Sequence, residues 1–314
     1  MVRVRYIAEH GVFSVADGCG AVLGVSISGH LLAVGCQSSS ERVRVWDWVK
    51  GEEVRRLGEH TAAVTDVAWR GDLLASCSGD GRAIVWNGMN GSRLRVHAGH
   101  NVLCSGVSWG SGGKLATSDV GHVRVWSENG TLVHVLRQGD GSLGCWGVAW
   151  HGDYVASGCD DGKVRVWHGV NGSLLRTLAG HTGHAKRVVW SRGGMLASAS
   201  KDKSVRVWVW ENGTEVMRLD TSDMAFGVGW HEDVVVGGSS DGKVYVWSSR
   251  DGTVQQTLDV HGGSKYVWDI AWRSDGGVFA SCSGDGSFSV WRSGHLVAGV
   301  ADGLDGAGIV MKLS

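Results

Sequence analysis

Seven tryptophans recur along the chain at nearly constant spacing. They are separated by 40, 40, 41, 41, 39 and 44 residues, at Trp46, Trp86, Trp126, Trp167, Trp208, Trp247 and Trp291. A second series runs in step with the first and comprises Trp69, Trp109, Trp150, Trp190, Trp230 and Trp272. A repeat of this length is one supersecondary unit that cannot bury its own apolar face, so copies must stack against one another. The spacing therefore predicts a repeat architecture through the whole chain.

Residues 59–97 contain one complete copy of the repeat. Asp80-Gly81 and Asn90-Gly91 indicate tight hairpin turns, because such pairs accept positive φ at little cost. Four antiparallel strands repeated around a ring form the blades of a β-propeller. We therefore predict an all-β, seven-bladed β-propeller of four-stranded antiparallel blades, forming a single domain over residues 1–314. The strands of this copy are expected at Ala62–Trp69, Leu73–Ser78, Arg82–Trp86 and Ser92–His97.

The residues at fixed positions within each repeat resemble the WD-repeat signature. A His lies nine residues before the second-series Trp, and a Ser and an Asp lie ten and six residues before the first-series Trp. The resemblance implies that these residue types form a hydrogen-bonded tetrad inside a blade. Because the set recurs, we interpret it as structural rather than catalytic. Complete sets are His60, Ser76, Asp80 and Trp86 in blade two, and His181, Ser198, Asp202 and Trp208 in blade five.

The two ends of the chain carry similar segments, residues 10–18 and 295–303. Both suit the outer-strand position of the last blade, where a terminal strand would remove an exposed sheet edge. We expect Val12–Val15 to pair with blade seven or to be displaced by Leu296–Val300. The leftover strand, with Val2–Tyr6 and Gly308–Lys312, would form an extra partial eighth blade. A monomer is expected, with a strand-exchanged dimer as the alternative.

Composition narrows the possible partners and location. The formal net charge is −1 and the pI is about 6.9, which gives no electrostatic attraction to nucleic acid or anionic membrane. Neither an apolar span nor a signal peptide is evident. The seven cysteines include no CxxC pair, and most fall in expected strands as small buried thiols. We therefore expect a reduced cytoplasmic location, with a nuclear one possible. Proline is absent, for which we find no physical reason.

No group of residues indicates catalysis. The pairs His97/His100 and His181/His184 have loose ligand spacing, but no cysteine or carboxylate supports a metal site. Glycines fall at hairpin turns, so no phosphate-binding loop is expected. A propeller enzyme would need carboxylates, histidines or a metal at the central channel, and the sequence shows no such cluster. We therefore predict no catalytic residue, no metal and no cofactor.

Binding is better supported. In the WD-repeat family, partners often dock on the top face, and the resemblance assigns that face to three positions in each repeat. These are the residues four and six before the second-series Trp and the residue before the tetrad Asp. Exposed aromatics beside cations are typical of interface hot spots, although such side chains could instead fold inward and plug the channel. The predicted partner-binding residues are Trp146, Asp160, His184, Lys186, Lys201, Met224, Phe226, Tyr266 and Trp268.

The resemblance and the residues together predict a non-catalytic scaffold. Its rigid top face would bind protein or peptide partners with little loss of ordering entropy. One alternative is a repeat fold or engineered propeller with no evolved ligand, which the missing prolines leave open. The other is a propeller enzyme with a central-channel site. Neither nucleic acid nor membrane is expected as a partner.

Overall fold

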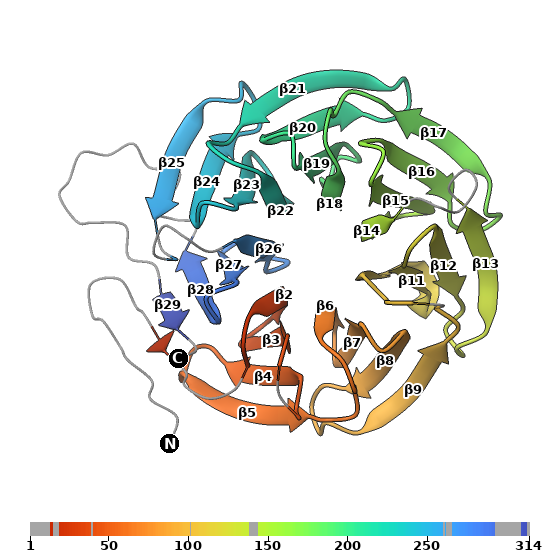
Figure 1. The fold of residues 1–314 in the computed structure, drawn as a ribbon, viewed down its shortest axis with the longest axis vertical. Coiled ribbons are helices and arrows are strands. Elements are labelled where there is room, and N and C mark those ends of the chain that lie inside the picture. The colour runs from red at the N-terminus through yellow and green to blue at the C-terminus, as the bar shows by residue number, and fades with distance from the viewer. Residues whose placement is uncertain are drawn as a thin grey trace.

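Seven β-sheets radiate from a common axis and form a closed ring (Figure 1). The computed structural model describes residues 13–14, 19–38, 40–100, 102–137, 144–259, 261, 266–292 and 309–312. Each blade consists of antiparallel strands that follow one another from the axis outward, here called strands a to d. The predicted all-β, seven-bladed propeller is therefore confirmed. Within the described residues, no helix is long and apolar enough to cross a membrane.

Blades one to three occupy the N-terminal half of the ring. In blade two the observed strands match the predicted ones to within two residues at each end. A 3-10 turn, η1 (Ser111–Gly113), joins strands a and b of blade three. From the axis outward the strands are β2 (Val22–Ser28), β3 (Leu31–Cys36), β4 (Val43–Asp47) and β5 (Glu52–Leu57); β6 (Val64–Arg70), β7 (Leu73–Ser78), β8 (Arg82–Asn87) and β9 (Arg93–Ala98); β10 (Gly106–Trp109), β11 (Leu115–Ser118), β12 (His122–Trp126) and β13 (Leu132–Arg137).

Blades four to six repeat the same order. The glycines at the predicted turns between strands c and d, from Gly51 to Gly252, all have positive φ between 72° and 92°. That backbone conformation is why glycine recurs there. The strands are β14 (Cys145–His151), β15 (Tyr154–Cys159), β16 (Val164–His168) and β17 (Leu174–Leu178); β18 (Ala185–Trp190), β19 (Leu196–Ser200), β20 (Ser204–Val209) and β21 (Thr214–Asp220); β22 (Ala225–His231), β23 (Val234–Ser239), β24 (Lys243–Ser248) and β25 (Val254–Asp259).

Blade seven contains both ends of the described chain. Its strands are β26 (Val267–Trp272), β27 (Val278–Ser283) and β28 (Ser287–Arg292), followed by β29 (Ile309–Lys312) and β1 (Phe13–Ser14). β29 pairs antiparallel with β28, and β1 pairs parallel with the outer side of β29.

The expectation that Val12–Val15 pairs with blade seven is met in that Phe13–Ser14 joins its sheet, whereas the placement of Gly308–Lys312 in a partial eighth blade was wrong. Ile309–Lys312 fills the outer position of blade seven rather than a partial eighth blade, and Phe13–Ser14 joins the same sheet one place further out. Similarity between two segments identifies candidates for one strand position, but the free edge of β28 can pair with a single neighbour. Leu296–Val300 and Val2–Tyr6 lie outside the described residues.

The core of the molecule lies between the blades. Each first-series Trp is at most 6% exposed and packs in an apolar cluster shared with a neighbouring blade. The cluster that closes the ring joins blade one to blade seven, where the ring centroids of Trp46 and Phe288 lie 5.8 Å apart. Removal of one such indole would cost on the order of 3–5 kcal/mol. Interblade burial therefore supplies the stability that an isolated four-stranded sheet lacks.

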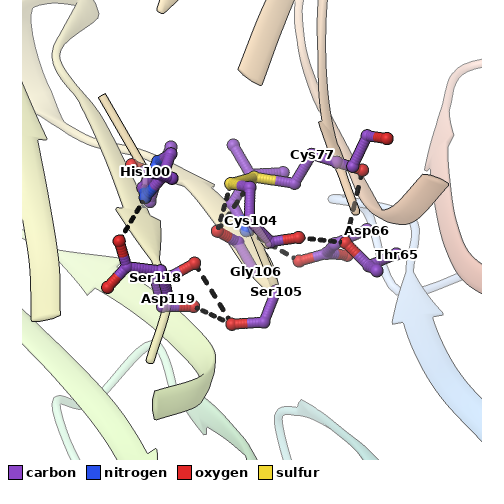
Figure 2. Close-up of a disulfide and its surroundings, with 12 residues drawn as sticks. Thr65, Asp66, Cys77, His100, Cys104, Ser105, Gly106, Ser118 and Asp119 are labelled. Atoms are coloured by element: carbon purple, nitrogen blue, oxygen red, sulfur yellow. Dashed lines mark hydrogen bonds and ion pairs between the residues drawn. A yellow bond between two sulfur atoms is a disulfide. The ribbon is translucent and has the colours of Figure 1, made fainter. Parts of the chain in front are cut away.

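Cysteines cross-link part of this core. Cys19 pairs with Cys36 in blade one, and Cys77 of β7 pairs with Cys104, next to β10 of blade three (Figure 2). The expectation of free thiols was thus wrong for these four, because their spacing carries no sequence signature and one pair joins two blades. Disulfides persist in oxidising compartments, so both bonds weigh against the expected reduced location. Cys145, Cys159 and Cys282 are free and buried.

The two disulfides predict the number of reactive thiols. Unfolded in denaturant without a reductant, the protein should react with a thiol reagent at three positions, and after reduction at all seven. Mass spectrometry of the alkylated protein counts the labels. Seven labels before reduction would show that neither disulfide forms.

Candidate functional site

The inner strand of each blade presents its residues to the channel in layers. We define position −4 and position −3 as the residues four and three places before the second-series Trp; Ile27 takes the place of that Trp in blade one. All seven residues at position −4 line one cavity of about 560 Å³, hereafter the channel cavity. They are Leu23, Thr65, Ser105, Trp146, Lys186, Phe226 and Trp268.

A β-bulge explains why these residues face the channel. In six of the seven blades the pairing of strands a and b shifts register at position −4, for example between Val64 and Asp66 and between Ala185 and Arg187. In a regular strand, consecutive side chains point to opposite faces, whereas a bulge inserts one residue and redirects its side chain. Positions −4 and −3 can therefore both face the axis.

Position −3 forms the floor of the channel cavity. Arg187 of blade five extends across the channel, where its Nη1 and Nη2 donate to the two carboxylate oxygens of Asp66 in blade two, at 2.9 and 2.8 Å. Its Nε donates to Asp269 Oδ1 of blade seven at 2.8 Å. We call Asp66, Arg187 and Asp269 the channel belt. Arg187 lines the channel cavity, and all three members line a second cavity of about 380 Å³, so the belt lies where the two cavities meet.

The remaining four blades have glycine at position −3. A Cβ atom at Gly24 would lie 2.7 Å from Asp66 Cα, and one at Gly147 would lie 2.7 Å from the carbonyl oxygen of Lys186. Such contacts are too short for any side chain. Glycine therefore allows the inner strands to approach closely around the belt. The four glycines are Gly24, Gly106, Gly147 and Gly227.

The carboxylates of the belt are fully engaged. Asp66 also accepts from the N–H of Val107 at 2.8 Å, and Asp269 accepts from the N–H of Val25 at 3.1 Å, which adds blades three and one to the network. Burial raises the pKa of Asp269, and although burial opposes a charge on Arg187, the carboxylates of Asp269 and Asp66 hold its pKa well above the usual value.

Sequence reasoning missed the belt and wrongly found no carboxylate directed at the channel. The signal is present when position −3 is compared across the repeats: it is Gly, Asp, Gly, Gly, Arg, Gly and Asp from blade one to blade seven. Two acids and one base among glycines, at one height around a ring, would have indicated an ion-paired cluster. Among the described residues, no group of three or more His, Cys, Asp and Glu side chains could hold a metal ion.

All nine predicted partner-binding residues line the channel cavity. On the side of blades four and five, Asp160 accepts from the indole N–H of Trp146 and lies 2.7 Å from His184 Nδ1. Lys186 Nζ lies 3.8 Å from the Asp160 carboxylate and 3.3 Å from the centroid of the Trp146 ring, a cation–π contact. The negative charge of Asp160 is thus neutralised inside this group.

The pKa of Lys186 is lowered to about 8, chiefly by burial; Asp160 opposes this shift, and the nearby Lys201 adds to it. Lys186 is only 9% exposed, so its ammonium is poorly hydrated. Near neutral pH most of it remains charged. A second negative group in the cavity would therefore stabilise the charged form.

On the side of blades six and seven the cavity wall is aromatic. Phe226 is 6% exposed and meets Tyr266 and Trp268 edge to face, at centroid distances of 5.2 and 5.0 Å. Tyr266 stacks on Trp268 at 5.0 Å and is 39% exposed. Phe226 therefore fills space behind the wall, while Tyr266 is partly exposed to solvent.

The predicted tetrads lie inside their blades and do not line the channel cavity. In blade two, His60 bonds Asp80 through Nδ1 at 3.0 Å and Ser76 through Nε2 at 2.8 Å, and Trp86 Nε1 donates to Ser76 at 2.9 Å. Although burial opposes it, hydrogen bonds from His60 and Arg82 hold the pKa of Asp80 below its usual value. Blade five repeats this geometry with His181, Ser198, Asp202 and Trp208.

Blades that depart from the signature use other polar partners. In blade three, His100 bonds Asp119 at 2.8 Å and Trp126 donates to Thr117 at 2.8 Å. In blade seven, His261 reaches Ser281 at 3.1 Å. Arg165 bonds Asp161 in blade four, and Tyr245 bonds Asp241 in blade six. Buried polar groups must be paired, and different side chains achieve this.

Comparison with known proteins agrees with this geometry. The family model "WD domain, G-beta repeat" matches residues 51–87, 130–168, 172–209 and 252–292. Among solved structures, the chain is similar to the computationally designed Ika8 protein, with a TM-score of 0.68 and 21% identity over 88% of this chain and 98% of that one. That likeness concerns the fold alone. No match was found among curated protein sequences.

The surroundings of Lys186 predict how its pKa responds to substitution. Because Asp160 favours the charged form, Asp160→Asn should lower the pKa of Lys186 below its value of about 8. The change can be followed by NMR titration of ¹³C-dimethylated lysines. The exposed Lys163, which pairs with Asp161, serves as the control and should not shift. An unchanged Lys186 titration would show that Asp160 does not act on it.

The belt predicts a large loss of stability when its cation is removed. Arg187→Met leaves Asp66 and Asp269 buried without a counter-charge, which should lower the free energy of unfolding by about 3–5 kcal/mol at pH 7. Acidification should reduce this loss, because protonation removes the unpaired charges. Urea denaturation measures both effects. The triple variant with Asp66→Asn and Asp269→Asn should recover part of the loss. A change below about 1 kcal/mol in Arg187→Met would contradict this role.

Proposed function

The chain belongs to the WD-repeat propellers, and we propose that it is a non-catalytic, monomeric platform whose channel cavity binds a segment of a protein partner. The observation that carries the proposal is the convergence of nine large or charged side chains from four blades on one cavity. Aromatic anchors beside cations in a concave site are the composition of interface hot spots.

The cavity is rigid because each of its walls is fixed by the fold. The bulged inner strands are hydrogen-bonded within their blades, and the channel belt ties together blades one, two, three, five and seven beneath it. On the side of blades two and three, the Cys77–Cys104 disulfide lies next to Thr65, whose hydroxyl donates to the carbonyl of Cys104 at 2.6 Å (Figure 2). A preorganised site loses little entropy when it binds.

A fold-only protein is the second candidate. The absence of proline and the likeness of the fold to a designed propeller favour it. Catalysis is less well supported, since the carboxylates of the belt already accept hydrogen bonds from Arg187 and from backbone N–H groups. A general base needs a lone pair within reach of its substrate.

Substitution of the exposed aromatics should separate binding from folding. We expect the double variant Tyr266→Ala/Trp268→Ala to lose the partners that the wild type captures from a lysate, as identified by mass spectrometry. Its melting temperature should fall by only a few degrees, because Tyr266 is 39% exposed and Trp268 packs against a buried cluster only as a partly buried side chain. Phe226→Ala is unsuitable for this purpose, since it is buried and its loss would cost about 3–5 kcal/mol.

A matched control is available on the outer strands. Leu174→Ala/Val254→Ala removes two exposed apolar side chains, 52% and 58% exposed, far from the channel cavity. This variant should retain every partner. If the channel variant and the outer-strand variant capture the same proteins as the wild type, the channel cavity is not the docking site.

A further inference from the structure

The channel cavity has two chemically different halves. Blade five contributes His184 and the two lysines Lys186 and Lys201, and blades six and seven contribute Met224, Phe226, Tyr266 and Trp268. Blades two and three contribute only the small residues Thr65 and Ser105. A ligand that fills the cavity therefore meets positive charge on one side and an apolar, aromatic wall on the other.

The positive charge of blade five is not balanced within the described chain. Five of the described lysines lie within 4.0 Å of a carboxylate, whereas no such contact is found for Lys201 or Lys114. Asp160 is the acidic residue of the cavity lining; it already accepts a hydrogen bond from Trp146 and lies 2.7 Å from His184 Nδ1 and 3.8 Å from Lys186 Nζ. Lys201 thus lines the cavity without a carboxylate partner among the described residues, and an anionic group would pair with it.

The aromatic half offers a rigid surface to a large apolar group. Tyr266 and Trp268 stack on each other, and Phe226 supports both from behind. Their rings are fixed by these contacts, so binding would cost little side-chain entropy. Apolar side chains packed against a preorganised aromatic wall carry much of the affinity of many interfaces.

The channel belt limits how the ligand enters. Because Arg187 spans the channel to Asp66 and Asp269, the belt obstructs the channel beneath the cavity. A chain cannot thread through the ring at this level. The ligand must lie across the mouth and insert individual side chains, as an extended peptide does.

We propose that the partner segment is an acidic peptide that presents an Asp or Glu and a large apolar side chain to the same cavity. The carboxylate pairs with Lys201 and approaches Lys186, while the apolar side chain packs on Tyr266 and Trp268. This proposal rests on the proposed function and names the chemistry of its partner. A single-stranded nucleic acid fits less well, because its backbone needs a track of cations, whereas the cavity offers two ammonium groups at one place.

Selection from an unbiased peptide library tests the chemistry directly. A phage library of random linear peptides is panned on the folded wild-type protein and, in parallel, on Lys201→Glu, with melting temperatures measured for both. Wild-type selection should enrich Asp or Glu next to Phe, Leu, Tyr or Trp. On Lys201→Glu the acidic preference should disappear or change to Lys and Arg, while the apolar preference remains.

The affinity of one selected peptide for a set of variants then shows which side of the cavity binds which part of the peptide. Lys201→Ala should weaken binding about tenfold, as expected for loss of one partly exposed charge-assisted contact. Tyr266→Ala should weaken it by a similar factor, whereas Lys114→Ala, the matched lysine without a carboxylate contact and outside the cavity lining, should have no effect. Binding should also weaken with salt.

The possible outcomes separate this inference from the proposed function. Enriched peptides that are basic or purely apolar, but that lose binding in Tyr266→Ala, would overturn the acidic chemistry and leave the docking site in place. Enrichment that is identical on wild type and Lys201→Glu would also overturn it. Absence of any enriched peptide, or tighter binding of a mixed-sequence single-stranded oligonucleotide, would overturn both.

Discussion

Burial between neighbouring sheets is the interaction on which the structure depends. A four-stranded blade hides its indole only when the next blade covers it, so every blade needs two neighbours and the row must close on itself. Closure occurs where Trp46 of blade one packs near Phe288 of blade seven. Because each blade is held from both sides, the inner strands cannot move independently. The rigidity of the channel cavity is therefore a consequence of how the core is built.

The same closure explains how a symmetric scaffold acquires an asymmetric site. Around the axis the inner strands approach so closely that a Cβ atom on any of the four position −3 glycines would lie 2.7–3.0 Å from the backbone of the next blade. The space saved by those glycines is occupied by one arginine and two aspartates from the other blades. The bulge then directs position −4 into the cavity above. One local irregularity, repeated in six blades, thus produces both the floor and the wall of the site.

Features that recur in every repeat could be predicted from the sequence. Features that join different repeats could not. The strands of blade two followed from alternation and turn residues inside one copy. The nine cavity residues followed from fixed positions relative to a Trp, although their binding role stays a proposal. The Cys77–Cys104 bond, the contact of Arg187 with Asp66 and the pairing of β29 with β28 each join residues from different copies or distant segments. Such pairings depend on the geometry of the closed ring, which local patterns do not encode.

Comparison of the repeats with one another distinguishes the residues that build the scaffold from those that form the site. The first-series Trp is the same in all seven blades, whereas positions −3 and −4 differ widely between them. Divergence at position −3 has a structural cause, since Asp66, Arg187 and Asp269 satisfy one another. At two positions of the cavity wall no such cause is found: Lys201 has no carboxylate contact among the described residues, and Tyr266 is 39% exposed. A chain kept only for its fold gains no stability from an unbalanced cation beside an exposed aromatic, whereas a chain that binds an acidic, apolar segment needs both.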